Sequence, residues 1–384
     1  MRICCLLLCV VVFPGFLKAQ EKTKNPSYLT AEYQYGYMLQ GNDFVKGVNS
    51  TGKAVKSFQA FYFDWGVQST GKELWHKVLN YPSYGIGGWA ALYPNEEMGN
   101  AFGVFGHFGS AFLRKPKWSL EYKIRFGMAW YFHPYNAEEY PYNVFTSSNL
   151  NDLISLGFLF TYELSPRLEL LFDLNVLHNS NGLLSVPDYG VNVIGPSLGL
   201  KYYVRGEHEH YMRVHADFPV PRRYSELLVK FFGSAVQNEF GDRARQSSGA
   251  YYFIGGLTLT WQRWVTHVSA FGGGLDWTYD GLTAAPKHGS PRKQASFGDK
   301  NLLGFFGSYE VRAGHFHLSF QLGYYFMKSS LTENQRLYQR VGLNYDISDN
   351  LFFGLALRAY DFSVADFIEW GGGVGFRIPI EFGK

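Results

Sequence analysis

A histidine and a serine two residues apart are the side chains of this chain best suited to acyl chemistry. The stretch LHNSNG, residues 177–182, contains His178 and Ser180. A serine hydroxyl becomes a nucleophile when a neighbouring imidazole takes its proton and a third polar group holds the ring. On a strand, residues i and i+2 share a face, so this spacing places base and nucleophile side by side. Backbone N–H groups near Asn181 and Gly182, or the Asn181 amide, could bind an oxyanion. This arrangement would suit the cleavage of an acyl ester.

The same letters also have a plain structural interpretation. A strand that ends at a surface becomes polar, and N-S-N-G is ordinary turn composition. The two interpretations differ in where the strand places His178 and Ser180. The elements around the motif must decide between them.

Apolar and polar residues alternate along much of the chain. In WSLEYKIRFGMAWYF, from Trp118, the even positions are apolar and the odd positions from 119 to 127 are polar or glycine. HFHLSFQLGYYF, from His315, and residues 370–382 alternate in the same way. Strands of soluble sandwiches usually have about five or six residues. These runs have ten to fifteen residues, enough to cross a bilayer at a tilt. The pattern predicts an all-β transmembrane barrel with one face toward lipid and the other toward a lumen.

Sixteen candidate strands follow from this pattern. They lie near residues 28–38, 57–68, 83–93, 101–114, 117–132, 150–164, 166–178, 191–204, 224–234, 249–261, 264–277, 301–312, 315–328, 336–346, 349–361 and 368–382. Short turns, as at 115–116 and 165–166, alternate with long polar loops, as at 39–56 and 133–148. An even strand number with periplasmic termini makes the long loops extracellular.

Two connections are too long for the short turns that this scheme makes them. Residues 69–82 and 205–223 could hold a small helix or an additional strand pair. We therefore expect one antiparallel outer-membrane barrel of about 14–16 strands over residues 20–384.

The barrel scheme places the histidine and the serine on the outside. In RLELLFDLNVLHNS, from Arg167, the lipid-facing parity runs through Leu168 and Val176 to His178 and Ser180. The next strand begins at Val191, and its outward parity begins with Asn192. We expect His178, Ser180 and Asn192 to meet on adjacent strands at the outer-leaflet boundary, where an acyl ester could arrive from lipid.

The composition supports a secreted membrane protein. Residues 1–19 have the basic start, the apolar stretch and the small residue, Ala19, of a secretory signal peptide. All three cysteines lie inside this segment, so disulfide and thiol chemistry are excluded for residues 20–384. Without Arg2 and Lys18 the chain has 33 basic and 32 acidic residues, a net charge of about +1 that suggests no nucleic-acid partner.

The motif resembles the active-site strand of two families of outer-membrane lipid hydrolases. These are the PagL-type lipid A 3-O-deacylases and outer-membrane phospholipase A. The longer pattern HNSNGLLSVPDYGVNVIGPSLGLKYY, residues 178–203, is most similar to the PagL-type, acyloxyacyl hydrolase-like branch. The resemblance implies a β-barrel with a His and a Ser that face the membrane from the outer leaflet.

The sequence departs from both families at one position each. The deacylases have Glu twelve positions after the serine, where this chain has Asn192, the residue type of the phospholipase. Asp188 is the nearest carboxylate that could orient His178 in place of that Glu. The phospholipases have an Arg after S-N-G that helps to hold calcium, and Leu183 stands there. We expect no metal and no cofactor.

Three weaker motifs favour structural interpretations. GPSLG, residues 195–199, has the letters of a nucleophile elbow, but Ser197 has lumen-facing parity in mid-strand. EHEHYMRVH, residues 207–215, could offer histidines to a metal but is expected to be a solvated connection. The basic loop within 278–300 could contact lipopolysaccharide phosphates, and a solvated loop is the default.

These observations predict an outer-membrane serine esterase. It would remove an ester-linked acyl chain from lipid A of lipopolysaccharide, with Ser180 as nucleophile, His178 as base and Asn192 as orienting group. One alternative is an outer-membrane phospholipase A. The other is a non-enzymatic, porin-like channel with a polar lumen that includes Glu121, Lys123, Arg125 and Arg358. The oligomeric state is not predicted.

Overall fold

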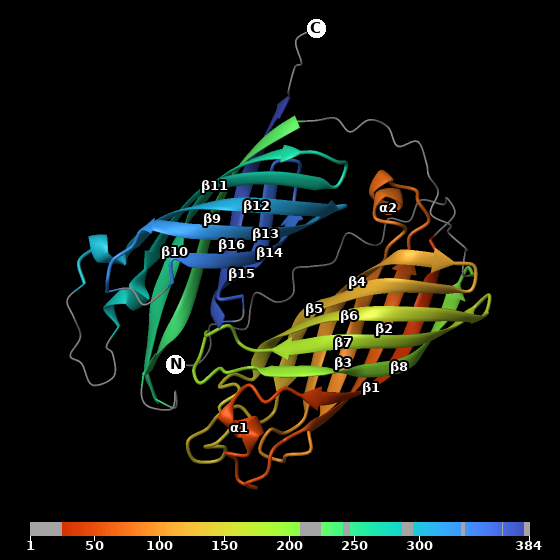
Figure 1. Cartoon of the computed structure of the whole chain (residues 1–384), viewed down its shortest axis with the longest axis horizontal. Helices are drawn as coiled ribbons and strands as arrows, with labels where there is room; N and C mark the ends of the chain where they lie inside the picture. Colours follow the sequence, from red (N-terminus) through yellow and green to blue (C-terminus); the bar gives the residue numbers. More distant parts are fainter. Residues whose placement is uncertain are drawn as a thin grey trace.

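The computed structural model describes residues 25–207, 224–240, 246–285, 295–331, 335–362 and 364–379. The expected signal peptide, residues 208–215 of the histidine-rich segment and the basic positions 287–293 lie outside these ranges. Within them the chain forms sixteen antiparallel strands (Figure 1). Each strand overlaps one predicted from alternation, which confirms the all-β barrel class.

The strands form two closed barrels that lie side by side in Figure 1. The first contains β1 (Ser27–Met38), β2 (Ser57–Gln68), β3 (Ser83–Leu92), β4 (Ala101–Lys115), β5 (Trp118–Tyr131), β6 (Leu150–Ser165), β7 (Leu168–Asn179) and β8 (Val191–Arg205). The second contains β9 (Tyr224–Phe240), β10 (Gln246–Trp264), β11 (Ser269–Asp280), β12 (Asn301–Ala313), β13 (Phe316–Met327), β14 (Leu337–Asp346), β15 (Leu351–Tyr360) and β16 (Val364–Pro379).

The expected single barrel over residues 20–384 is therefore corrected to two barrels of eight strands each. β8 turns back to pair with β1, as at Leu29 and Tyr202, and β16 pairs with β9, as at Val229 and Val374. Alternation depends only on which face of a strand meets lipid, so it is the same whether a ring closes after eight strands or sixteen. The long connection at 205–223 is the passage from one barrel to the other.

Short helices occupy some of the connections. α1 (Asp43–Lys46) lies in the β1–β2 loop, where the Asn42 side chain accepts a hydrogen bond from Val45 N–H. α2 (Leu74–Val78) is the first of the two alternatives left open for 69–82, a small helix and not a strand pair. Two 3-10 turns, η1 (Gly281–Ala284) and η2 (Gly298–Lys300), lie between β11 and β12. None of the described helices is both long and apolar enough to cross a membrane.

The outside of both barrels is apolar. In β6, Leu156 and Phe158 are 55% and 59% exposed, whereas Ser155 is buried. The second barrel presents Phe231, Leu275 and many other large apolar side chains outward in the same way. Soluble monomers rarely expose apolar patches of this extent, and lipid-facing barrel walls have this character.

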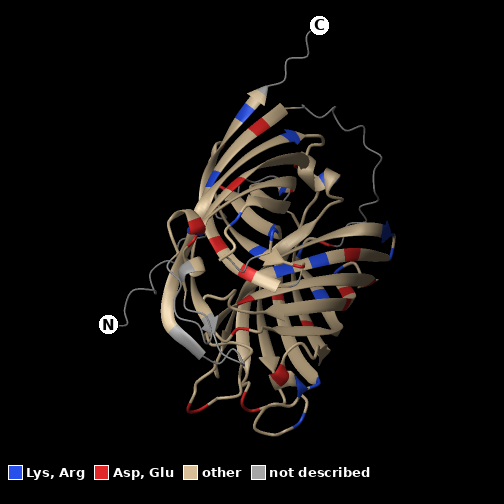
Figure 2. Cartoon of the chain, turned by 60° about the vertical axis from the view of Figure 1, so that its left-hand side comes forward, with Lys and Arg blue, Asp and Glu red and all other residues tan. Residues whose placement is uncertain are grey.

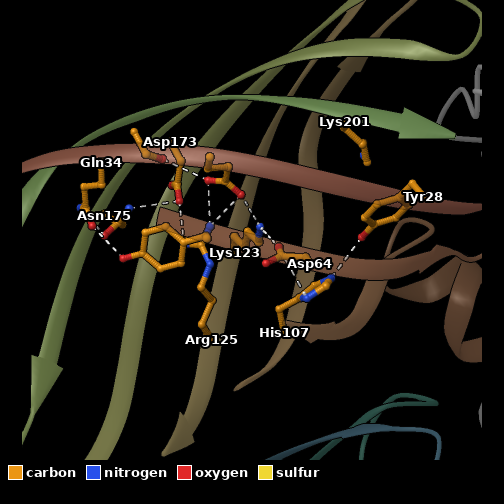
Figure 3. A network of polar contacts seen from close by, with 12 residues as sticks. Tyr28, Gln34, Asp64, His107, Lys123, Arg125, Asp173, Asn175 and Lys201 are labelled. Atoms are coloured by element: carbon orange, nitrogen blue, oxygen red, sulfur yellow. Dashed lines mark hydrogen bonds and ion pairs between the residues drawn. The ribbon is translucent and has the colours of Figure 1, made fainter. Parts of the chain in front are cut away.

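Ion pairs fill the interior of the first barrel (Figure 3). Lys123 Nζ lies 2.8 Å from Glu32 and 2.7 Å from Asp64. Arg125 lies 2.9 Å from Glu32 and 2.8 Å from Asp173, and all five side chains are buried. An eight-stranded barrel is about wide enough to be filled by side chains. The charges thus pair across the lumen and join strands that are not neighbours.

A second network occupies the other barrel. Arg340 lies 2.7 Å from Asp276 and 2.9 Å from Glu369, and Arg358 lies 2.8 Å from Glu369. Figure 2 shows acidic and basic residues on strands of both barrels. The residues expected to line one porin lumen are thus divided: Glu121, Lys123 and Arg125 belong to the first barrel and Arg358 to the second.

Candidate active site

Two neighbouring strands of the first barrel, β7 and β8, bring the predicted trio together. His178 in β7 is the direct cross-strand partner of Asn192 in β8 and of Ile154 in β6. These positions share the outward parity, and Ser180 follows β7 at the end of the barrel that carries the long loops. The exposed Val176 and Ile194 continue the same face toward the middle of the barrel. The trio therefore lies where a lipid-facing wall meets a loop.

A continuous hydrogen-bond chain links the three side chains. His178 Nε2 lies 2.9 Å from Ser180 Oγ, and His178 Nδ1 lies 2.8 Å from Asn192 Oδ1. The Asn192 oxygen can only accept, so it selects the tautomer with the proton on Nδ1. This leaves the Nε2 lone pair directed at the serine hydroxyl, the arrangement that a general base requires.

Asp152 is a member of this site that the sequence analysis missed. Its Oδ1 accepts a hydrogen bond of 2.8 Å from Ser180 N–H, and its Oδ2 lies 3.3 Å from Ser180 Oγ. The Asp152 N–H donates to the Ser180 carbonyl at 2.7 Å. This carboxylate holds the serine from β6, opposite the histidine. The available signal was its parity, because in LNDLISLGF a charged residue shares the face of Ile154, Leu156 and Phe158.

Asp188 has a different place from the one expected. Its carboxylate accepts hydrogen bonds from the N–H groups of Asn181, at 3.0 and 3.1 Å, and Leu183, at 3.0 Å. It thus folds the 181–188 turn, while Asn192 occupies the Nδ1 side of His178. The carboxylate expected as a possible substitute acts on the loop backbone instead.

The oxyanion donors expected at Asn181 are both engaged. The Asn181 N–H donates to Asp188, and the side-chain amide donates to the Ser185 carbonyl at 2.9 Å. The N–H of Gly182 makes no hydrogen bond within the described part of the chain. Gly182 has a φ of +62°, which glycine adopts without strain. Of the expected donors, the Gly182 N–H is thus the one not engaged within the described residues, and Gly182 itself is buried.

Gly190 supports the trio from behind. A Cβ atom built there would lie 3.0 Å from His178 Cε1 and 3.4 Å from Ser180 Cβ, and the residue has a φ of +65°. Its carbonyl accepts a hydrogen bond of 3.0 Å from the Asn42 side chain. The loop can therefore pass close to the imidazole only because glycine stands at this position.

The spacing H-x-S recurs in the second barrel without this environment. His317 and Ser319 lie in β13, where His317 is buried and bonds to Asp346 at 2.7 Å, while Ser319 donates to the Gly342 carbonyl at 3.3 Å. Ser197, from the GPSLG motif, is buried in β8 and donates to Glu32 at 3.0 Å. Outward parity at a strand end therefore distinguishes the pair His178 and Ser180. Among the described residues, no cluster of three His, Cys, Asp or Glu side chains could hold a metal ion.

Comparison with known proteins gives a family match over the second barrel. Residues 225–379 match the family described as acyloxyacyl hydrolase, C-terminal domain. The match supports a PagL-type family, and it lies outside residues 178–203, from which the resemblance was drawn. With the apolar exterior, it places the chain in the bacterial outer membrane. No curated protein matches in sequence.

Solved structures of outer-membrane proteins show a distant likeness. The siderophore receptor PirA from Acinetobacter baumannii is 8% identical, with 88% of this chain and 44% of the receptor covered, at a TM-score of 0.25. OccK10 (OpdN) from Pseudomonas aeruginosa is 12% identical, with 92% and 99% covered, at a TM-score of 0.24. A porin from Rh. blastica is 9% identical, with 91% and 99% covered, at a TM-score of 0.20. The chain spans less than half the length of the receptor.

Proposed function

We propose that this protein is a serine esterase of the outer membrane that removes an ester-linked acyl chain from lipid A of lipopolysaccharide. The observation that carries the proposal is the hydrogen-bond chain from Ser180 Oγ through His178 to Asn192 on the lipid-facing wall. A structural polar cap would not need an imidazole aligned with both a hydroxyl and an amide oxygen.

The chemistry follows from the positions of these groups. Ser180 Oγ attacks the ester carbonyl while its proton passes to His178 Nε2, and we assign the Gly182 N–H as the donor to the resulting oxyanion. The imidazolium then gives its proton to the departing alcohol oxygen as the carbon–oxygen bond breaks. Water, deprotonated by the same nitrogen, hydrolyses the acyl-serine and releases the fatty acid. Asn192 holds the ring, and Asp152 holds the backbone of the nucleophile.

Location and family point to lipid A as the substrate class. If the long-loop end of the first barrel is extracellular, as expected from the loop lengths, Ser180 would lie at the outer leaflet, where lipopolysaccharide resides. The matched family is named for an acyloxyacyl ester, a linkage of the kind found in lipid A. The exposed side chains of Val176 and Ile194 would contact the acyl chains of the substrate.

Phospholipase activity is the second candidate, and Asn192 favours it. The third member of the trio is an amide at 2.8 Å from His178 Nδ1, the residue type of the phospholipase family. A porin is not favoured, because each barrel has only eight strands and buried ion pairs cross both interiors. A lumen of this size holds side chains, whereas porins of about 16–18 strands enclose an aqueous channel.

The test uses purified protein in detergent with lipopolysaccharide or phospholipid, each with and without chelator, and product detection by mass spectrometry. We expect the wild type to remove one acyl chain from lipid A, and Ser180→Ala to lose this product. Ser319→Ala is the matched control, since it removes a serine with the same H-x-S spacing from the second barrel. A lysophospholipid product would transfer the proposal to the phospholipase. The absence of any product that depends on Ser180 would refute it.

A further inference from the structure

The loop that follows Ser180 contacts the second barrel directly. The N–H of Gln237 in β9 donates to the Leu183 carbonyl at 3.3 Å, and the Gln237 side-chain oxygen accepts from Val186 N–H at 3.1 Å. Gln237 and the loop are more than fifty residues apart in the chain and belong to different barrels. The segment beside the nucleophile is thus bonded to both barrels.

An apolar contact reinforces this docking at the glycine of S-N-G. A Cβ built on Gly182 would lie 2.5 Å from the Cδ1 and Cγ1 atoms of Ile368 in β16. Ile368 has outward parity, between the buried Phe367 and Glu369. A side chain at position 182 would therefore have to displace the second barrel, and glycine lets the two approach.

The pairing of β9 explains why the loop finds a partner there. β9 pairs with β16 only from Tyr224 to Gly233, whereas its pairing with β10 extends beyond that point, as at Gln237 and Tyr251. Past Gly233 the first-barrel loop lies beside β9 and accepts from its backbone. Strand edges are ready sites for such backbone hydrogen bonds.

A second contact joins the barrels at their opposite ends. Gly314, in the turn between β12 and β13, lies against the indole of Trp75 in α2, with a built Cβ 3.6 Å from three ring atoms. Figure 1 shows α2 at the end of the first barrel that faces away from α1 and toward the second barrel. Two separated contacts fix the relative position of two bodies better than one.

We propose that the second barrel is a positioning wall for the active site, and that Gln237 and Ile368 act by holding the 181–188 loop and with it the Gly182 N–H. The inference rests on the proposed esterase function and assigns part of it to the barrel that carries no catalytic residue. The loop is held from one side by Asp188 and from the other by Gln237 and Ile368. Displacement of an oxyanion donor by about 1 Å can lower a rate by as much as about 100-fold.

An engineered disulfide tests the contact between Gly182 and Ile368 by a readout that does not depend on enzymatic activity. The built Cβ of residue 182 lies 3.6 Å from the Cβ of Ile368, within the range of about 3.5–4.5 Å found in disulfides. Residues 20–384 contain no cysteine, so Gly182→Cys with Ile368→Cys introduces the only pair. After oxidation in intact outer membranes, we expect mass tagging in denaturant to find no free thiol. The control pairs Ile368→Cys with Gly52→Cys, a loop position with nothing within 4 Å of a built Cβ, and should keep both thiols free.

Reactivity of Ser180 tests the positioning role. A fluorophosphonate probe labels activated serines and does not require lipid binding, so it reports the site alone. We expect Ile368→Ala and Gln237→Ala to slow labelling and to lower kcat about tenfold. Ile368→Val keeps a branched side chain and Gln237→Glu keeps an acceptor oxygen. Both variants should therefore retain most of the wild-type labelling rate. Ile378→Ala should behave as wild type.

The outcomes separate the two proposals. Thiols that stay free in the Gly182→Cys, Ile368→Cys protein would overturn the docking contact even if the wild type hydrolyses lipid A. A disulfide that forms, with Ile368→Ala and Gln237→Ala labelled at the wild-type rate, would overturn the positioning role. A disulfide that forms in a protein whose wild type is neither labelled nor active would overturn the esterase function, and the catalytic role of the wall with it.

Discussion

Replacing Asn192 tests whether an uncharged amide orients the base. Asn192→Leu keeps the length of the side chain but removes the oxygen that lies 2.8 Å from His178 Nδ1. A hydrogen bond to a group that becomes charged contributes about 1.5–3 kcal/mol. At about 1.4 kcal/mol for each factor of ten, its loss predicts a fall of about 10- to 150-fold in kcat/KM. Loss of the preferred tautomer would add to this fall.

Asn192→Asp provides the matched second arm. A carboxylate at the same position would stabilise the protonated imidazole, so a higher pH would be needed to form the basic imidazole. At a separation near 4 Å the attraction is at most about 4 kcal/mol at an effective dielectric constant of about 20, and the half-buried site reduces it. We expect the acidic limb of the pH–rate profile to move about one pH unit upward, with activity retained at high pH.

The assay follows initial rates of acyl release from lipopolysaccharide in mixed micelles between about pH 5 and pH 9, a range that brackets histidine titration. Labelling of Ser180 by a fluorophosphonate serves as a second measure. If Asn192→Leu has wild-type kcat/KM, or if the Asp variant leaves the acidic limb in place, Asn192 does not hold the ring and the trio assignment fails.

Three further predictions concern the site and its scaffold. Asp152→Ala should lower kcat about tenfold while Asp152→Asn, which keeps an acceptor for Ser180 N–H, stays within a few-fold of wild type; equal rates for both would exclude a role in holding the serine. Gly190→Ala should lower the Ser180 labelling rate because its Cβ meets His178, whereas Gly52→Ala, with a similar φ of +64° and nothing within 4 Å, should not; matching rates would mean that the loop adjusts. Lys123→Ala should reduce the free energy of unfolding in urea by about 3–5 kcal/mol, because it leaves the buried carboxylates of Glu32 and Asp64 without this cation. Lys115→Ala, at an exposed position, is the control. A change of less than about 1 kcal/mol would show that water or a rearrangement replaces the ion pair.

The sequence predicts what depends on local alternation. Every strand and the outward parity of His178 and Asn192 follow from period-two patterns, and those patterns come from the simple demand that one face meets lipid. Ring closure depends on pairing between β1 and β8, which are more than a hundred residues apart, and no local pattern reports it. The length of the connection at 205–223 was the sign in the sequence that one barrel ends and another begins.

The sequence predicted that the three side chains meet, and it missed the residues that support them. His178 and Ser180 share a strand and Asn192 stands on the next one, so register could bring them together. Asp152 comes from a strand on the other side, and its charge on a lipid-facing parity could have identified it. Asp188 was misjudged because loop conformation, here a turn closed on the N–H groups of Asn181 and Leu183, cannot be derived from composition.

Because the two barrels belong to one chain, they need little direct contact to stay together. Two separate proteins that meet in a membrane must bind with an affinity matched to their surface density. A tethered partner is present at an effective concentration set by the tether, about millimolar for short flexible links. The contacts at Gln237 and Ile368, with the one between Gly314 and Trp75, can then suffice to keep the wall in place. Activity per molecule should therefore be independent of how densely the protein populates the membrane.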